Sequence, residues 1–562
     1  MTRINAGGAI FARLKTLGVS HVFANSGTDF PPVIEGLAQA AEAGIDLPEA
    51  TLAPHEHAAM GMAHGAWLAT GRLQAVMLHT NVGLANGVIG ALNAASDHVP
   101  VIIMSGRTPT VEAGRFGART VPIGWGQEMR DQHALIRECV KWDYELRFPE
   151  QIGPLLDRAA AIALSYPQGP VYLSLPREIL SEEVDTPAGP PAYAPAGLRA
   201  PAEEIERAAR LLALAERPVI AAQRGAGDAA GWAALARLAE EWAIPVADWW
   251  AVANALSRDH PAWIGPAIGA ALEGADVALV IDSLAPWSPD MHAVPPGLRI
   301  VQLGPDPHMA RTPVRMFASE VALATETGPG LVAIEAAMRP HFAEAAGRIA
   351  ARRPRLVALN AAALADAEKA SAHVSGAPMT KGFVSAAIGA AIRGREVTVL
   401  SELGAPLASL GLTERGQWRQ EPHAGGLGWS FPAALGMKLG APGRLVVATM
   451  GDGSYIFSNP VACHQIAEAL GLAPLLVILN NAEWGAVRQS VAGLYPGGAA
   501  ARANRMPLTA LAPSPDFTAV ARASRAFAMR VEAADDLALA LAEALAETER
   551  GRLALLDVAV SG

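Results

Sequence analysis

A short segment in the last third of the chain has the residue types that a metal ion and phosphates require. Gly451–Ser454 reads Gly-Asp-Gly-Ser and directly follows Leu445–Met450, an apolar run that predicts a β-strand. Small residues around an aspartate at the carboxyl end of a strand leave room for a ligand, and open α/β sheets bind ligands at that edge. Asp452 could hold a divalent cation, while Gly453 and Ser454 could offer backbone N–H groups and a hydroxyl to phosphates at the start of a helix. A plain turn has the same composition, so this segment alone leaves both interpretations open.

A pair of asparagines follows the next apolar run and extends this set of oxygen ligands. Leu475–Leu479 predicts another strand, and Asn480 and Asn481 stand at its end. One carboxylate, one amide oxygen and a nearby carbonyl form a set of hard oxygens that suits Mg²⁺ clamping a diphosphate. The asparagines could instead cap a helix. The strand, the spacing and the asparagine pair together favour a site for Mg²⁺ and a diphosphate.

A glutamate near the front of the chain is a candidate acid or base. Glu56 lies in Ala53–Ala59 (Ala-Pro-His-Glu-His-Ala-Ala), just before a run that predicts a helix. A carboxylate in an apolar cleft can share a proton with a ligand nitrogen. A glutamate in the first turn of a helix is also stabilised by the helix dipole without doing any chemistry. The residue alone does not decide between these two roles.

Two other predicted strand ends in the first third carry groups that can exchange or orient protons. His79 ends the strand candidate that begins at Ala75, and imidazole exchanges protons near neutral pH. Thr28 and Asp29 follow another strand candidate, His21–Ala24, and either could orient a carboxylate or a leaving proton. His79 could also be a core histidine with satisfied hydrogen bonds, and Thr28 could cap a helix.

The elements that must position these residues alternate between short apolar strands and alanine-rich helical stretches. This alternation predicts an α/β protein with three doubly wound parallel-sheet domains at residues 1–184, 202–341 and 377–562. A proline-rich linker, Asp185–Pro201, separates the first two domains, and Phe342–Gly376 predicts a helix before the third. The strand candidates are His21–Ala24, Ala75–His79, Val99–Met104, Val171–Leu175, Pro218–Gln223, Ala275–Ile281, Leu298–Leu303, Glu396–Leu400, Leu445–Met450, Pro474–Leu479 and Leu553–Val560.

Composition and charge exclude several classes of function. The 562 residues include 44 Lys and Arg against 54 Asp and Glu, and the net charge of −10 argues against a nucleic-acid partner, which requires a basic surface. The two cysteines are too few for a disulfide framework or a cysteine-rich zinc site. No apolar run of about 18 residues predicts a membrane span, and Met1–Ile10 has no apolar signal segment. We therefore expect a cytoplasmic protein with no membrane partner.

The segment Gly451–Asn481 resembles the thiamine-diphosphate motif of the superfamily that includes pyruvate oxidase, acetohydroxyacid synthase and benzoylformate decarboxylase. The resemblance implies thiamine diphosphate and Mg²⁺ as cofactors. It also implies that Asp452, Asn481 and the backbone carbonyl of Glu483 hold the metal. The residues around the phosphates would be Gly451, Gly453 and Ser454.

A segment further upstream, Gly425–Gly436 (Gly-Gly-Leu-Gly-Trp-Ser-Phe-Pro-Ala-Ala-Leu-Gly), resembles the part of that family that cradles the aminopyrimidine ring. Leu427 stands where the family has a bulky apolar residue that wedges between the two rings and bends the cofactor. The backbone carbonyl of Gly425 would accept a hydrogen bond from the 4′-amino group. Trp484 would line the pocket, and a core position would suit it equally.

The first third of the chain resembles the other half of such a site. A glutamate placed as Glu56 contacts the pyrimidine nitrogen in this family and, by stabilising the imino tautomer, leads to the C2 carbanion. His79 stands where benzoylformate decarboxylase has a histidine, Thr28 where that enzyme has a catalytic serine, and Asp29 near the acidic residue of the pyruvate decarboxylase branch. By its motifs, the chain is most similar to benzoylformate decarboxylase.

One departure from the family pattern concerns a second histidine, which benzoylformate decarboxylase carries in its middle domain. The corresponding stretch here, Ala285–Pro289, contains none, so the sequence does not favour an aryl 2-oxo acid as substrate. His292 lies close by and His423 precedes the Leu427 segment, and the sequence assigns a role to neither. It also leaves open whether FAD is bound.

The resemblance implies a decarboxylase or carboligase that acts on a 2-oxo acid through a C2 carbanion and an enamine. It implies a homodimer at minimum, because each site takes its glutamate from one subunit and its diphosphate motif from another, and a homotetramer as the common assembly. One alternative is a thiamine-diphosphate-dependent lyase or hydrolase of 2-hydroxy ketones or cyclic diketones. Another is a catalytically silent paralogue, which the presence of Glu56, Asp452 and Asn481 disfavours.

Overall fold

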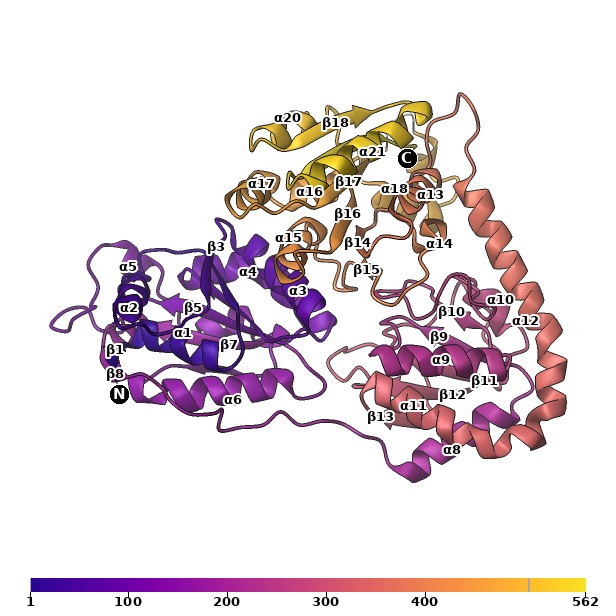
Figure 1. Cartoon of the computed structure of the whole chain (residues 1–562), viewed down its shortest axis with the longest axis horizontal. Helices are drawn as coiled ribbons and strands as arrows, with labels where there is room; N and C mark the ends of the chain where they lie inside the picture. Colours follow the sequence, from indigo (N-terminus) through magenta and orange to yellow (C-terminus); the bar gives the residue numbers. More distant parts are fainter. Residues whose placement is uncertain (1, 504–505, 562) are drawn as a thin grey trace.

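Three α/β units, each built on a parallel β-sheet, make up the chain. The computed structural model describes residues 2–503 and 506–561. Figure 1 shows the N-terminal unit in indigo and purple, the middle unit in magenta and the C-terminal unit in orange and yellow. The predicted fold class is therefore confirmed. The predicted domain bounds stay a prediction, and residues 186–201 between the first two units contain no helix or strand.

The N-terminal unit has a six-stranded sheet with helices on both faces. Helices α1, α2 and α6 pack on one face, and α3 and α4 pack on the other. The strands in spatial order are β3 (Glu49–Leu52), β2 (His21–Ala24), β4 (Gln74–Leu78), β5 (Val101–Arg107), β7 (Val171–Pro176) and β6 (Asp143–Glu145). A separate antiparallel pair is β1 (Arg3–Asn5) with β8 (Glu183–Asp185). The helices are α1 (Ala6–Thr16), α2 (Pro31–Glu42), α3 (Glu56–Thr70), α4 (Thr80–Ser96), α5 (Ile123–Gly126), α6 (Ile152–Leu164) and α7 (Arg177–Leu180).

The middle unit has a five-stranded parallel sheet and its own apolar core. The strands in spatial order are β10 (Val246–Ala247), β9 (Pro218–Ala222), β11 (Val277–Ile281), β12 (Arg299–Gly304) and β13 (Val321–Ala324). The helices are α8 (Ala202–Leu214), α9 (Ala229–Glu241), α10 (Ile268–Leu272) and α11 (Thr327–Met338).

A single long helix, α12 (Phe342–Ser371), connects the middle unit to the C-terminal unit (Figure 1). Arg352 in α12 donates to the carbonyls of Ala213, Ala215 and Trp242, which end α8 and α9. Because the last carbonyls of a helix lack partners within it, these bonds cap both helices. The predicted helix between the second and third domains is confirmed, and its arginines attach it to the middle unit.

The C-terminal unit has a six-stranded parallel sheet. The strands in spatial order are β15 (Trp418–Gln420), β14 (Val397–Glu402), β16 (Leu445–Gly451), β17 (Leu475–Asn480), β19 (Ala554–Ala559) and β18 (Phe527–Val531). The helices are α13 (Lys381–Ile392), α14 (Leu407–Leu410), α15 (Ser430–Gly440), α16 (Asp452–Phe457), α17 (Pro460–Ala469), α18 (Gly485–Leu494), α19 (Ala499–Arg502), α20 (Phe517–Arg522) and α21 (Ala534–Glu549).

The strands that the sequence predicts are the central strands of the three sheets, and the edge strands went unpredicted. The edge strands are β3, β6, β10, β13, β15 and β18. They are only two to five residues long, too short for a clear pattern. Within the described residues, no helix is long and apolar enough to span a membrane. A cytoplasmic location stays a prediction.

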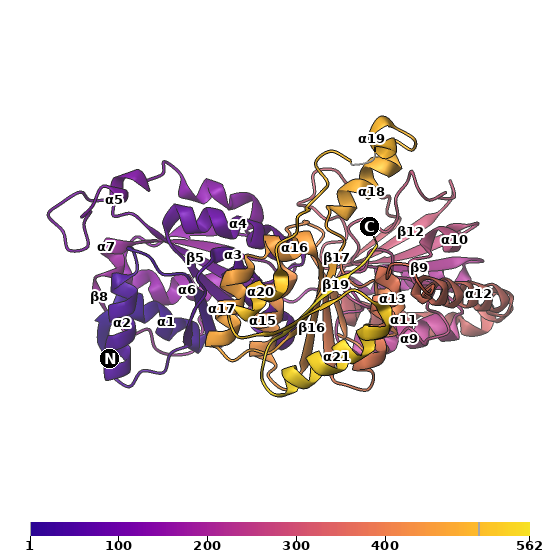
Figure 2. The same ribbon diagram turned by 90° about the horizontal axis from the view of Figure 1, so that it is seen from above.

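Helices α3 and α15 cross at close range and join the N-terminal unit to the C-terminal unit (Figures 1 and 2). Glycines permit this approach: a Cβ on Gly65 would lie 1.8 Å from the carbonyl oxygen of Ala433, and one on Gly436 would lie 1.9 Å from that of Met62. Residues of both helices belong to one buried apolar cluster. The crossing therefore fixes how the two units sit in one chain.

We expect Gly65→Ala to lower the free energy of unfolding by about 1–3 kcal/mol, because the added methyl group overpacks a contact between two backbones. Thermal unfolding followed by circular dichroism measures this loss. The matched control is Gly347→Ala in α12, where a Cβ meets no atom within 4 Å and the melting temperature should hold or rise. Equal melting temperatures for both variants and the wild type would contradict the close crossing.

Candidate active site

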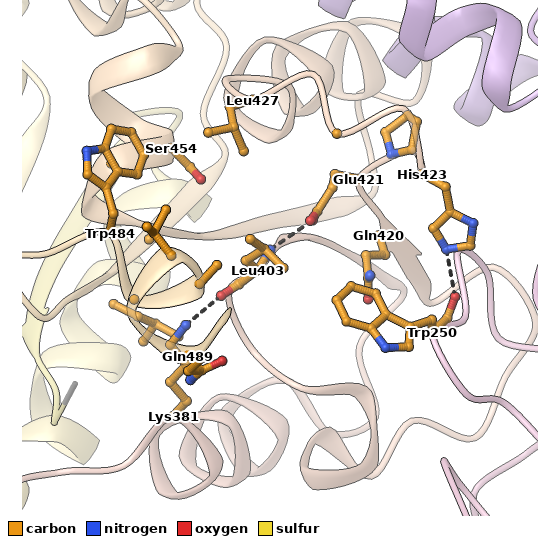
Figure 3. Close-up of a pocket in the computed structure, with 18 of the residues that line it drawn as sticks. Trp250, Lys381, Leu403, Gln420, Glu421, His423, Leu427, Ser454, Trp484 and Gln489 are labelled. Carbon is orange, nitrogen blue, oxygen red and sulfur yellow. Dashed lines mark hydrogen bonds between the residues drawn. The ribbon is translucent and has the colours of Figure 1, made fainter. Parts of the chain in front are cut away.

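A cavity of about 660 Å³ lies between the middle and C-terminal units (Figure 3). The C-terminal unit contributes residues at the carboxyl ends of β14, β16 and β17, and the middle unit contributes residues that follow β9, β10 and β11. The carboxyl edges of two parallel sheets therefore face each other across the cavity. Because open α/β sheets bind ligands at this edge, the cavity is the candidate ligand site.

Asp452, Asn481 and Glu483 all line this cavity. Asp452 begins α16 directly after β16, and burial raises the pKa of its carboxyl to about 6. Its Oδ2 atom is buried and has no hydrogen-bond partner among the described residues. Asn481 Oδ1 accepts from the N–H of Glu483 at 3.2 Å. A buried carboxylate oxygen without a partner is costly, and a bound cation would remove that cost.

The donor types also fit Mg²⁺ with a diphosphate. Residues 2–503 and 506–561 contain no cluster of three or more His, Cys, Asp or Glu side chains that could hold a metal. One carboxylate, one amide and one backbone carbonyl instead leave coordination positions for phosphate oxygens and water, as Mg²⁺ requires. The lining is therefore compatible with the expected pair of cofactors, and the assignment of these three ligands stays a prediction.

Glycines keep space open in the cavity wall. Gly451 and Gly425 both line the cavity, and a Cβ on either would meet no atom within 4 Å. Gly453 differs, because a Cβ there would lie 2.4 Å from the indole of Trp484, which packs over the start of α16. Ser454 also faces the cavity, on the side of Trp484 in Figure 3. The residues predicted to contact the phosphates thus line the same cavity as Gly425, whose carbonyl is predicted to contact the 4′-amino group.

Leu427 reaches the cavity from a loop that Glu402 holds in place. Glu402 ends β14 and is fully buried, and its two oxygens accept N–H bonds from Gly428 at 2.5 Å and Ser430 at 2.7 Å. Burial raises the pKa of Glu402. These bonds tie the loop that carries Leu427 to the end of a central strand, which positions the predicted wedge residue.

The middle unit supplies an aromatic wall at the other side of the cavity. Trp249, Trp250 and Ala285 line it, so the stretch predicted to correspond to a histidine-bearing segment does reach the site, but without a histidine. His423 also lines the cavity, and its Nε2 donates to the carbonyl of Trp250 at 3.0 Å (Figure 3). Burial lowers the pKa of His423 to about 4, so its ring is neutral near pH 7. Among the described residues, His292 is outside the cavity lining and packs against Trp249.

Leu403 in the cavity wall is hydrogen-bonded to two ionisable side chains, Lys381 and Glu421. Lys381 Nζ donates to its carbonyl at 2.8 Å, and its N–H donates to Glu421 Oε2 at 2.8 Å (Figure 3). Leu403 has φ +47°, a left-handed conformation that a leucine adopts only where its surroundings enforce it. Burial lowers the pKa of Lys381 and raises that of Glu421 to about 8.

Glu56 lies in the N-terminal unit, in a clamp of two amides. It is the first residue of α3 and is 6% exposed. Asn25 Nδ2 donates to Oε1 at 2.9 Å and Asn86 Nδ2 donates to Oε2 at 3.0 Å. A Cβ on Gly83 would lie 2.8 Å from Oε1, so the glycine makes room for the carboxylate. A carboxylate that is stabilised only by the helix dipole needs no side-chain partners. The clamp instead fixes both oxygens of Glu56 in one orientation.

His79 and Asp29 form a hydrogen-bonded pair beside Glu56. His79 Nδ1 donates to Asp29 Oδ1 at 2.5 Å, and Gln127 Nε2 donates to the opposite ring nitrogen at 3.2 Å. The hydrogen bond to Asp29 raises the pKa of His79, and the charges of Asp29 and Glu56 act in the same direction. Thr80, the next residue, has φ +42° and bonds Asp29 Oδ2 through its N–H at 3.3 Å.

Thr28 is exposed, and its side chain does not cap α2, whose N-cap residue is Phe30. Its carbonyl accepts a hydrogen bond from Arg177. The helix-cap alternative for Thr28 is therefore wrong, and its catalytic role stays a prediction.

The two groups of predicted site residues lie apart within one chain. In the described part of the chain, the cavity lining has no residue from the N-terminal unit. Glu56, His79 and Asp29 lie at the carboxyl edge of the N-terminal sheet, while Asp452, Asn481 and Leu427 lie at the cavity. One copy of the chain therefore does not bring Glu56 into its own cavity.

Several side chains of these two groups were missed from the sequence. They are Asn25, Asn86, Gln127, Lys381, Glu421, Trp249 and Trp250. Asn25 directly follows the strand candidate His21–Ala24, and Asn86 lies further along the chain from His79, but only the fold shows that their amides reach Glu56. Trp249 and Trp250 follow β10, an edge strand of two residues that the sequence did not predict.

Three family models match the chain along its length. The N-terminal thiamine pyrophosphate binding domain matches residues 4–135, the central domain matches residues 205–327 and the C-terminal thiamine pyrophosphate binding domain matches residues 405–558. The chain belongs to the thiamine pyrophosphate enzymes. The predicted site residues of this thiamine pyrophosphate enzyme fall within its two cofactor-binding domains. Trp249 and Trp250 fall in the central domain, and Lys381 lies outside the three matches.

Known relatives of this thiamine pyrophosphate enzyme span nearly its whole length. Benzoylformate decarboxylase of Pseudomonas aeruginosa is 28% identical over 96% of each chain. A probable acetolactate synthase large subunit of Methanocaldococcus jannaschii is 25% identical over 98% of this chain and 91% of the relative. The structure of a thiamine diphosphate-dependent 4-hydroxybenzoylformate decarboxylase of Rhodococcus jostii has the same fold, with a TM-score of 0.77, 22% identity and 99% coverage of both chains. The expected family is confirmed.

We expect Asp29→Asn to destabilise the protein more at about pH 5.5 than at about pH 9. The pKa of His79 is raised in the folded chain, so its pairing with Asp29 adds most to the free energy of unfolding below the pKa of an unfolded histidine. This stabilisation is lost as the pH rises through the folded-state pKa. Melting temperatures of variant and wild type at both pH values measure the difference. The control is Asp290→Asn at an exposed carboxyl. An equal loss at both pH values would contradict the assignment.

Proposed function

We propose that this protein is a thiamine-diphosphate-dependent decarboxylase or carboligase that acts on a 2-oxo acid. The observation that carries the proposal is a cavity with a partnerless buried carboxylate oxygen on Asp452, in a chain that belongs to the thiamine pyrophosphate enzymes. The named activities of its relatives, decarboxylation of benzoylformate and synthesis of acetolactate, both begin with a 2-oxo acid. When bound, thiamine diphosphate supplies a nucleophilic carbon and accepts the electrons of the bond that breaks.

Asp452, the amide of Asn481 and the carbonyl of Glu483 hold Mg²⁺ in this proposal. Gly451 leaves space for the phosphates, because a side chain there would enter the cavity. Gly453 offers its backbone to the phosphates, and its small size makes room for the indole of Trp484. Leu427 and the carbonyl of Gly425 line the part of the cavity proposed for the aminopyrimidine ring. The three metal ligands would hold Mg²⁺, and through it the phosphates, at the carboxyl edge of β16 and β17.

The proposed active form is a homodimer in which Glu56 of one copy completes the cavity of the other, and two such dimers form a tetramer. Since a single chain keeps Glu56 out of its own cavity, a second copy is needed to supply it. Apolar side chains are exposed on both units that would meet. They are Leu52, Val82 and Leu92 on the N-terminal unit and Ile456, Phe457 and Val461 on the C-terminal unit. Exposed apolar groups of this kind are typical of surfaces that a partner covers.

The amide clamp gives Glu56 its role as a proton carrier. Asn25 and Asn86 hold both carboxylate oxygens, so the group has one fixed orientation from which it exchanges a proton with a ring nitrogen. His79 is the second proton carrier, because Asp29 fixes its Nδ1–H and leaves Nε2 on the side of Gln127. Thr28 stands at the rim of the same sheet edge and orients the carboxylate of the substrate.

The aromatic wall receives the substrate side chain. Trp249, Trp250 and Leu427 present apolar surface, and Gln420 and Gln489 add neutral amides. Apolar walls favour loss of a charged carboxylate because the anion is poorly solvated there. Proton delivery from His79 favours release of an aldehyde, whereas entry of a second carbonyl compound leads to ligation.

We expect Glu56→Gln to lower the rate of 2-oxo acid turnover by at least about 100-fold while the cofactor still binds, because only proton transfer is lost. Carbon dioxide release from a panel of aliphatic and aromatic 2-oxo acids, with Mg²⁺ and thiamine diphosphate added back to stripped protein, measures the rate. Product analysis with and without an aldehyde acceptor separates decarboxylation from ligation.

The matched control is Glu35→Gln, an exposed glutamate of α2, which should keep wild-type rates. Full activity of Glu56→Gln would refute its role. Wild-type protein that turns over 2-hydroxy ketones or cyclic diketones but no 2-oxo acid would favour the lyase or hydrolase alternative.

A further inference from the structure

Lys381 is a half-buried cation that the proposed use of the cavity leaves unexplained. It lines the cavity together with Asp452 and Glu421, and it is the first residue of α13. Its Nζ donates to the carbonyl of Leu403 at 2.8 Å, the one partner that the structure gives this atom among the described residues. Since an ammonium group has three N–H donors, two remain for another acceptor.

A lysine at this place is unfavourable for the protein alone. The first turn of a helix carries a partial positive charge, which repels a cation, and α13 has no acidic residue in its first turn to offset it. Burial also penalises the charged form and lowers the pKa of Lys381. The charges of Asp452 and Glu421 attract it, but neither carboxylate forms an ion pair with it in the described structure. A nearby anion would turn this unfavourable position into a favourable one.

The cofactor of the proposed function brings such an anion to this cavity. A diphosphate carries more negative charge than one Mg²⁺ neutralises, and the Asp452 carboxylate would already neutralise part of the charge of the metal. Negative charge on the diphosphate would therefore remain unpaired. Lys381 and Asp452 line the same cavity and act on each other electrostatically. Leu403, to which Lys381 is bonded, follows β14, the neighbour of the strand that ends at Gly451.

We propose that Lys381 is a cofactor-binding residue whose ammonium group contacts the diphosphate of thiamine diphosphate. This inference rests on the proposed function, and it adds a direct charge contact from the protein to the contact made through Mg²⁺. The contact selects the diphosphate over thiamine and thiamine monophosphate. Lys381 at the same time holds the strained backbone of Leu403 through its carbonyl.

Binding of three ligands that differ only in phosphate tests this role. Thiamine, thiamine monophosphate and thiamine diphosphate are titrated with excess Mg²⁺ into wild-type, Lys381→Met and Lys381→Arg protein, and binding is followed by calorimetry and by quenching of the tryptophans that line the cavity. We expect Lys381→Met to weaken thiamine diphosphate binding about 10- to 100-fold, and thiamine binding far less. Lys381→Arg should recover most of the loss. The control is Lys369→Met at an exposed position of α12, with wild-type affinities.

The other outcomes separate this inference from the function on which it rests. Equal affinity of wild type and Lys381→Met for thiamine diphosphate would overturn the contact and leave the proposed function standing. Equal losses for thiamine and thiamine diphosphate would also overturn it, because Lys381 would then act only by holding Leu403. Wild-type protein that binds none of the three ligands would overturn the proposed function itself.

Discussion

The close crossing of α3 and α15 is the contact on which the rest of the structure depends. Gly65 and Gly436 let the two backbones touch, and the buried cluster around them joins the N-terminal and C-terminal units into one core. Glu56 is the first residue of α3, and the loop that carries Leu427 leads into α15. The crossing therefore sets Glu56 and the cavity in fixed positions that do not coincide within one chain. This constraint is the physical reason why the proposed site needs a second copy of the chain.

The central strands could be predicted from the sequence because burial on both faces demands continuous apolar residues. β17 and β4, for example, are buried at every position. Edge strands need no continuous apolar run, because one of their sides has no neighbouring strand. β15 reads Trp-Arg-Gln and β6 reads Asp-Tyr-Glu, and three residues are too few to show a period. Their pairing is set by the neighbouring strand, which lies far away in the sequence.

The site residues also divide into those that the sequence predicts and those that only the fold shows. Asp452, Asn481 and Glu56 could be proposed from the sequence because each stands at a strand end or helix start in a recognisable segment. The pairing of His79 with Asp29, and the amide clamp on Glu56, depend on which strands are neighbours in the sheet, and this only the fold shows. Lys381 gave no signal, since a lysine at a helix start looks like an exposed residue until the cavity is seen.

The most direct test of a shared site is activity in mixed dimers of two inactive variants. Glu56→Gln and Asp452→Asn are co-expressed with different affinity tags, and particles that carry both tags are isolated. If Glu56 serves the cavity of the other copy, each mixed dimer has one site with both residues intact, and we predict about half of the wild-type activity. If Glu56 serves its own chain, every site lacks one residue. Mixed dimers that stay as inactive as the two parents would contradict the account.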